Sequence, residues 1–165
     1  MKVIFLNIDN ITLSSNLTNK PFIDRIVQYN FCKTLRRIIK KTDAKFVLTA
    51  FNKSNIAKLY FKTTFKKYGI NVYDCTQNIG MEKGIDIQEW LNHHLDVENI
   101  AILDDNNDMC HLSEYLVKMN MKKSKFLWLF QSLNNKFVKQ CTLTLNKPFD
   151  NKMKNQVKGN VRKLF

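Results

Sequence analysis

The sequence has 165 residues and a mass of 19.5 kDa, the length of one ordinary globular domain. Its 44% hydrophobic and 25% charged residues exclude a wholly disordered chain, and four Gly and two Pro exclude collagen-like and proline-rich classes. Lys and Arg outnumber Asp and Glu by 27 to 14, so the formal net charge is +13. We predict a single domain over residues 1–165, in which residues 147–165 form a basic tail or a closing helix.

Apolar runs separated by longer amphipathic stretches predict alternating strands and helices. Strands are predicted at 2–8, 44–49, 70–74, 99–103 and 125–130, with the less apolar third strand nearer an edge. Helices are predicted at 21–41, 52–67, 83–95 and 109–118, with Leu59 and Leu95 on the buried sides of the second and third helices. This alternation favours an α/β fold, a three-layer α/β/α sandwich with a Rossmann-like, mainly parallel sheet.

The cysteines and the apolar runs bear on cellular location. Cys32, Cys75, Cys110 and Cys141 are far apart, with no C-x-x-C pair and no signal peptide upstream. This pattern predicts a reducing intracellular compartment, the cytoplasm or alternatively the nucleus. The longest apolar run, residues 126–130, is too short to span a bilayer, so no membrane contact is expected. The oligomeric state is left open.

The charge is segregated along the chain. Residues 11–70 carry 13 basic and 2 acidic side chains, and residues 118–165 carry 12 and 1. Between them, residues 71–117 carry 1 basic and 10 acidic side chains. This pattern fits a metal-binding centre inside a polyanion-binding rim, or lysine-rich helix faces that only keep the protein soluble. The same alternatives hold for Arg36, Arg37, Lys40 and Lys41, which form either a nucleic-acid-binding stripe or a solvated helix face.

Polar residues with related chemistry follow three of the predicted strands. Asn7 and Asp9 follow the first strand, Thr49 the second, and the acidic group Asp104, Asp105 and Asp108 the fourth, while Lys83 begins a helix. The carboxyl ends of parallel strands share one edge of the sheet, where ligands bind. Clustered carboxylates suit Mg²⁺, and a lysine and a hydroxyl beside the metal suit a phosphoryl group.

In this order and spacing, these residues resemble the motifs of the haloacid dehalogenase (HAD) superfamily of phosphohydrolases. The matching motifs are Asn7-Ile8-Asp9, Val47-Leu48-Thr49, Lys83 and the stretch Leu103–Met109. The sequence around Lys83 and before Asp104 is similar to a compact branch associated with nucleic-acid repair proteins. The resemblance covers about residues 2–110. Few residues separate the first two strands, which implies little or no cap domain and an open crevice for bulky substrates.

The resemblance implies a role for each matching residue. Position 7 would be the nucleophile that forms an aspartyl-phosphate, and Asp9 the general acid and base. Thr49 would hydrogen-bond the phosphoryl oxygens, and Lys83 would neutralise the phosphate. The Mg²⁺ site would consist of position 7, Asp9 and Asp105, supported by Asp104 and Asp108.

Position 7 departs from the family pattern because it is Asn. An amide is a poor nucleophile toward phosphorus, so the chain as written is expected to be inactive or nearly so. A deliberate Asp→Asn change, a natural pseudo-phosphatase and slow deamidation of Asn7 are the three explanations. We therefore expect a Mg²⁺-dependent phosphatase scaffold for nucleotide or polynucleotide phosphate ends, impaired at Asn7. The alternative is a pseudo-phosphatase that binds nucleic acid or a protein partner without catalysis.

Other conspicuous residues have structural interpretations. His93 and His94 point about 100° apart on a helix, which disfavours a shared metal site. Trp90 is expected to anchor the core. In the pair Cys110-His111, a buried thiol beside a surface histidine is favoured over an approach to the site.

Overall fold

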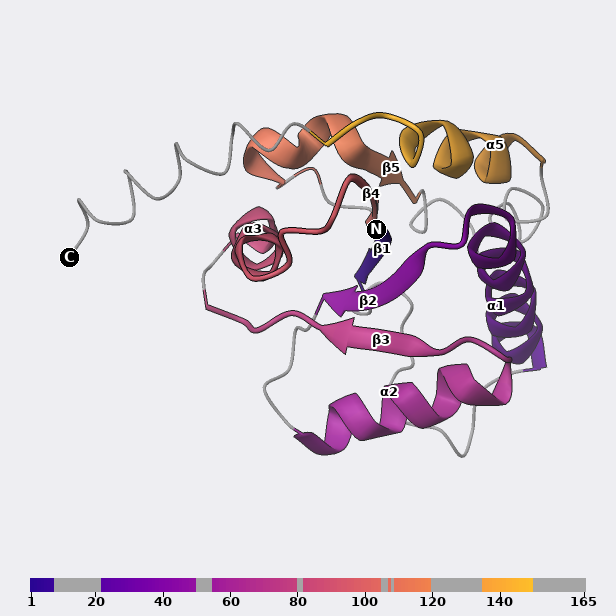
Figure 1. Ribbon diagram of the computed structural model, residues 1–165. Helices are drawn as coiled ribbons and strands as arrows, with labels where there is room; N and C mark the ends of the chain where they lie inside the picture. The colour runs from indigo at the N-terminus through magenta and orange to yellow at the C-terminus, as the bar shows by residue number, and fades with distance from the viewer. Residues whose placement is uncertain are drawn as a thin grey trace.

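The structure is a computed structural model that describes residues 1–7, 22–49, 55–79, 82–104, 107, 109–119 and 135–149. Its centre is a five-stranded sheet in the order β3-β2-β1-β4-β5, and each neighbouring pair of strands is parallel. The strands are β1 (Lys2–Asn7), β2 (Lys45–Thr49), β3 (Val72–Cys75), β4 (Asn99–Asp104) and β5 (Leu116–Lys118). As predicted, β3 lies at an edge of the sheet. β1 is the central strand, between β2 and β4 (Figure 1).

Helices cover both faces of the sheet, which confirms the predicted three-layer α/β/α sandwich. The helices are α1 (Phe22–Thr42), α2 (Asn55–Lys67), α3 (Lys83–Asn92), the 3₁₀ helix η1 (Cys110–Tyr115) and α5 (Asn135–Thr144). Side chains of α1, α2 and α5 form one buried cluster with one face of the sheet. Side chains of α3 and η1 form a second cluster with the opposite face.

The alternation of side chains along β1 shows why both faces are covered. Ile4 and Leu6 point into the first cluster, whereas Val3 and Phe5 point into the second, and all four are completely buried. Successive residues of a strand face opposite sides, so an apolar run without polar interruptions requires apolar cover on both sides. The central position of β1 therefore follows directly from its sequence.

The predicted helix over 109–118 is wrong. Residues 110–115 form the short 3₁₀ helix η1, and residues 116–118 form the edge strand β5. Val117 is completely buried, because β5 pairs in parallel with β4. The pairing of these three residues with the sheet outweighs their local helical pattern. The strand predicted over 125–130 lies outside the described residues.

Two residues predicted to face inward are exposed. Leu59 on α2 is 67% exposed. Leu95 is 71% exposed because α3 ends at Asn92, so Leu95 belongs to the turn that follows it. These errors concern the ends and the rotation of helices, and the order of the elements is unaffected.

Residues 147–149 return to the sheet rather than leaving it. The backbone N–H of Phe149 donates to the carbonyl of Glu98 at 2.7 Å, and its ring packs against that of Tyr115. Phe149 is 6% exposed and belongs to the second cluster. The rest of the predicted tail or closing helix, residues 150–165, lies outside the described residues.

Candidate active site

Three candidate residues end three adjacent strands of the sheet. Asn7 ends β1, Thr49 ends β2, and Asp104 ends β4. Asn7 pairs directly with Thr49 across the β1–β2 ladder, and Leu6 pairs with Leu103 across the β1–β4 ladder. Because all three strands are parallel, their ends lie at the same edge of the sheet, as the sequence predicts.

The side chains of Asn7 and Asp104 meet at this edge. The amide Nδ2 of Asn7 donates a hydrogen bond to Oδ1 of Asp104 at 3.0 Å. Each residue is only 1% exposed, so this contact is shielded from bulk water. A hydrogen bond to a buried carboxylate is stronger than one between neutral groups. Asn7 therefore stabilises the negative charge of Asp104 directly.

Lys83 provides a positive charge on the other side of the same carboxylate. Its Nζ lies 3.7 Å from Oδ2 of Asp104, and its side chain is 26% exposed. Lys83 thus contacts both the buried carboxylate and the solvent-accessible side of the site. An ammonium group in this position can also neutralise an anion that approaches from solvent.

The beginning of α3 is packed closely against the segment that follows β4, and this packing positions Lys83. A Cβ atom on Gly84 would lie 2.6 Å from the carbonyl oxygen of Met109, so only glycine fits there. The thiol of Cys110 donates to the carboxylate of Glu82 at 2.7 Å. These contacts flank Lys83 in sequence, and they hold its backbone beside Asp104.

Thr49 completes the described part of the site. It is 5% exposed, and its Oγ1 donates to the carbonyl oxygen of Leu6 at 3.3 Å. That long hydrogen bond places the hydroxyl next to Asn7, its partner in the ladder. A hydroxyl can rotate to donate to another acceptor, so Thr49 can serve an incoming phosphoryl oxygen.

The remaining predicted metal ligands, Asp9, Asp105 and Asp108, lie outside the described residues. Within the described ranges, no group of three or more His, Cys, Asp and Glu side chains could hold a metal ion. The donors that the structure does place at the edge are the oxygen-bearing side chains of Asn7 and Asp104, which suit a hard cation such as Mg²⁺. Asp104 is held by an amide and an ammonium group, an arrangement typical of a supporting residue.

The predicted basic stripe lies apart from this site. Arg36, Arg37, Lys40 and Lys41 are exposed on the last turns of α1, which lead to the amino end of β2. The site lies at the carboxyl end of that strand. The stripe therefore does not form part of the candidate active site.

The predicted environments of Cys110 and His111 are reversed. Cys110 is exposed, whereas His111 is partly buried and forms a hydrogen bond of 2.7 Å with Oε1 of Gln88. Burial lowers the pKa of His111. Gln88 is 2% exposed, so this contact holds η1 against α3. The pattern of the sequence contains no signal for this pair, because the two residues belong to separate elements.

The prediction that Trp90 anchors the core is confirmed. Trp90 is 6% exposed, and its indole N–H donates to Asp74 at 2.7 Å. The His94 ring stacks on Trp90 at a centroid distance of 3.6 Å. The buried carboxylate of Asp86, which is not among the predicted site residues, accepts the backbone N–H of Ile79 at 2.8 Å and so links α3 to the segment that follows β3.

Comparison with protein families identifies one match. The family model for the HAD domain in Swiss Army Knife RNA repair proteins matches residues 3–124. That range contains all the predicted catalytic and metal-binding positions and excludes α5. No curated protein and no solved structure matches the chain. Over the described residues, no helix has the length and apolar character needed to cross a membrane.

Proposed function

The chain belongs to the HAD domains of Swiss Army Knife RNA repair proteins, and from this premise we propose that it is a Mg²⁺-dependent phosphatase scaffold for phosphorylated polynucleotide ends. The observation that carries the proposal is the buried carboxylate of Asp104, held between Asn7 and Lys83 beside Thr49. This combination supplies a charged group and a hydroxyl for a phosphoryl group at the position where α/β sheets bind ligands.

With a carboxylate at position 7, the reaction would proceed in two displacements. An oxygen of that carboxylate forms a bond to phosphorus while the bond from phosphorus to the oxygen of the nucleic-acid end breaks. Asp9 gives a proton to the departing oxygen. A water molecule then attacks phosphorus and loses its proton to Asp9, which releases inorganic phosphate and restores the carboxylate.

Thr49 and Lys83 would stabilise the phosphoryl group during both displacements. The hydroxyl of Thr49 donates to one phosphoryl oxygen, and the ammonium group of Lys83 neutralises the negative charge. Asp104 acts here as a positioning residue, because its contact with Lys83 keeps the ammonium group at the edge.

A magnesium ion would be held by the oxygens of position 7, Asp9 and Asp105, with Asp108 in support. When bound, Mg²⁺ would neutralise the oxygens of the transferring group. The carbonyl oxygen of the Asn7 amide is a weaker ligand than a carboxylate, so weak Mg²⁺ binding is expected for the chain as written.

The chain with Asn7 is expected to bind a phosphorylated end without rapid turnover. An amide oxygen carries no full negative charge, and the Asn7 nitrogen already donates to Asp104. The groups that would bind the phosphoryl group are nevertheless retained. The residues between β1 and α1, 8–21, are too few for a folded lid domain, which fits a substrate as bulky as a nucleic-acid end.

One observation favours the alternative of a non-catalytic binding module. The Asn7 amide is complementary to the Asp104 carboxylate, so this contact is stable without any cation. An amide that donates to Asp104, where a carboxylate would repel it, suits a site that binds a nucleic acid or a protein partner without catalysis.

Restoring the carboxylate separates the two functions. Asn7→Asp is expected to release inorganic phosphate from RNA oligonucleotides with a 3′- or 5′-phosphate, and only when Mg²⁺ is present. Asn7→Ala is the matched control, because it removes the amide without supplying a nucleophile. If folded Asn7→Asp protein releases no phosphate from these oligonucleotides or from mononucleotides, the phosphatase proposal is wrong and the binding module stands.

A further inference from the structure

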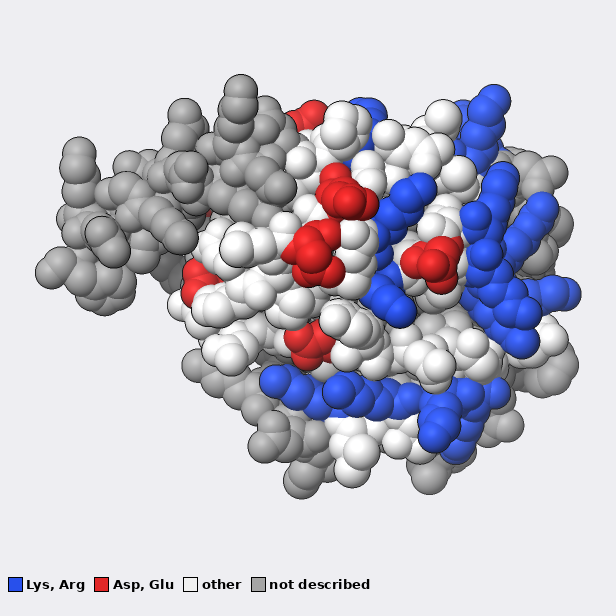
Figure 2. Space-filling model, in the orientation of Figure 1, with Lys and Arg blue, Asp and Glu red and all other residues white. Residues whose placement is uncertain are grey.

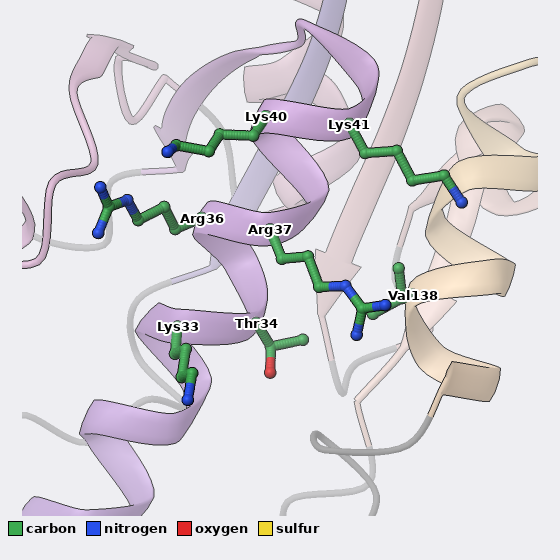
Figure 3. Close-up of a pocket in the computed structure, with 7 residues that line it drawn as sticks. All are labelled: Lys33, Thr34, Arg36, Arg37, Lys40, Lys41 and Val138. Atoms are coloured by element: carbon green, nitrogen blue, oxygen red, sulfur yellow. The ribbon is translucent and has the colours of Figure 1, made fainter.

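A basic pocket opens between α1 and α5, apart from the candidate active site. Its volume is about 590 Å³, and it is lined by Lys33, Thr34, Arg36, Arg37, Lys40, Lys41 and Val138 (Figure 3). The volume is that of a ligand pocket and is far larger than one ion requires. Five of its seven described lining residues are cationic, and none of those seven is acidic.

Four of the five cations around the pocket point in two directions. In Figure 3, Arg37 and Lys41 extend toward α5, on the side of Val138, whereas Arg36 and Lys40 extend toward the opposite side of α1. This division follows from helix geometry, because residues four apart lie on the same face. Arg37 and Lys41 are therefore the cations that face the space between the two helices.

Arg36 lies against the end of α2. A Cβ on Gly69, which has a positive φ of 70°, would lie 3.1 Å from Cζ of Arg36. Gly69 follows the C-terminus of α2, where a cation is favourable because the helix dipole is negative. Arg36 thus packs on the end of α2 and not toward α5.

We propose that the pocket between α1 and α5 binds the sugar–phosphate backbone of a nucleic-acid strand, with Arg37 and Lys41 as its principal phosphate contacts. A guanidinium group binds phosphate oxygens through two parallel hydrogen bonds, and an ammonium group adds a point charge. Figure 2 shows Lys and Arg gathered over α1 and, separately, along α2. The area over α1 contains the pocket, so its cations border a concave space.

The orientation of α1 relates the pocket to the candidate active site. α1 leads from β1 to β2 and ends just before the amino end of β2, so it runs opposite to the strands. Lys33 is therefore nearer the catalytic edge than Lys41, and about 12 Å of helix separates them at about 1.5 Å per residue. A strand bound along this face can extend toward Asn7. Only this anchoring role rests on the proposed function; binding by the pocket does not.

The test compares two double variants that remove the same charge from different helices. Arg37→Gln/Lys41→Gln removes the cations facing the pocket, and Lys66→Gln/Lys67→Gln removes two exposed lysines from the last turn of α2. Binding of a fluorescein-labelled single-stranded RNA is measured by anisotropy on the full chain, and circular dichroism and thermal unfolding check that each variant is folded.

We expect Kd to rise at least about tenfold for Arg37→Gln/Lys41→Gln and less than about threefold for Lys66→Gln/Lys67→Gln. The slope of log K against log salt should also decrease by about 1.4 for the first variant, because each phosphate contact to a single strand contributes about 0.7. Both expectations concern binding, so they hold whether or not Asn7→Asp has phosphatase activity.

Three results would overturn the proposal. Equal weakening by the two double variants would show a general effect of charge without a defined site. If the unmodified chain does not bind RNA, the pocket does not bind a nucleic-acid strand. Unchanged RNA binding by Arg37→Gln/Lys41→Gln, with loss of binding to phosphatidylserine vesicles, would assign the pocket to a membrane surface.

Discussion

Replacing Asn7 by aspartate places two carboxylates where the chain now has a hydrogen bond. The two atoms in contact, Nδ2 of Asn7 and Oδ1 of Asp104, are 3.0 Å apart, and each residue is 1% exposed. Two unit charges at this distance repel by about 5.5 kcal/mol at an effective dielectric constant of about 20. The substitution therefore acts on stability as well as on chemistry.

Uptake of a proton limits this destabilisation. Carboxylate pairs can share one proton instead of carrying two charges. For an aspartate with an ordinary pKa of about 3.9, the proton costs about 4 kcal/mol at pH 7 and about 1.5 kcal/mol at pH 5. Lys83, 3.7 Å from Asp104, offsets part of the repulsion. We expect Asn7→Asp to lose about 2–4 kcal/mol of unfolding free energy at pH 7, and about 1 kcal/mol at pH 5.

Urea denaturation at the two pH values, with and without millimolar Mg²⁺, measures these differences. Mg²⁺ should restore most of the stability of Asn7→Asp at pH 7, because a bound cation removes the repulsion. Asn7→Ala serves as the control, since it loses the hydrogen bond without gaining a charge and therefore has no repulsion between positions 7 and 104 for Mg²⁺ to remove. If Asn7→Asp is as stable as the unmodified chain at pH 7 without Mg²⁺, the side chains at positions 7 and 104 are not in contact.

Three further predictions follow from the packing, the thiols and the basic pocket. Gly84→Ala should lower the unfolding free energy by about 1–3 kcal/mol, because the new Cβ would overlap the Met109 carbonyl. At an unhindered helical position the same substitution would stabilise the protein, so equal or higher stability in urea would contradict the close approach. Burial raises the pKa of both Cys32 and Cys141 to about 12. Because the unfolded thiols ionise near pH 9 while the folded ones stay neutral, the unfolding free energy should fall by about 1.4 kcal/mol per thiol between pH 8 and pH 10. Cys32→Ala/Cys141→Ala should reduce this dependence of stability on pH, and an unaltered dependence would contradict the burial of the thiols. In the Asn7→Asp background, KM for phosphorylated RNA should fall with strand length until the strand reaches the pocket and then stay constant, and a KM independent of length would separate the pocket from catalysis.

The fold was predictable because its strongest signals are local. The continuous apolar runs of β1, β2 and β4 require cover on both faces, and that requirement alone indicates a parallel sheet between two helical layers. β5 was missed because it is only three residues long and is stabilised by pairing with β4. α5 was missed as well. The buried residues Val138 and Cys141 of α5, with Leu145 directly after it, are spaced by three and four positions, a signal that could have identified the helix.

The positions of the site residues were predictable, and their contacts were not. Parallel strands bring Asn7, Thr49 and Asp104 to one edge of the sheet regardless of their side-chain conformations. The hydrogen bond between Asn7 and Asp104 and the close packing of Gly84 on the loop after β4 depend on tertiary distances, which spacing along the chain does not contain. For the same reason, Arg36 looks equivalent to Arg37 in the sequence, although only Arg36 packs on the end of α2.

The central claim is that position 7 is the point of phosphoryl transfer at the carboxyl edge of the sheet. Its most direct measurement is mass spectrometry of Asn7→Asp protein quenched in acid during turnover of a phosphorylated RNA oligonucleotide with Mg²⁺. We expect a phosphoryl group on the peptide that contains position 7, removable by hydroxylamine and absent from Asn7→Ala. Phosphate release by Asn7→Asp with no modification at position 7, or with the modification on another peptide, would contradict it.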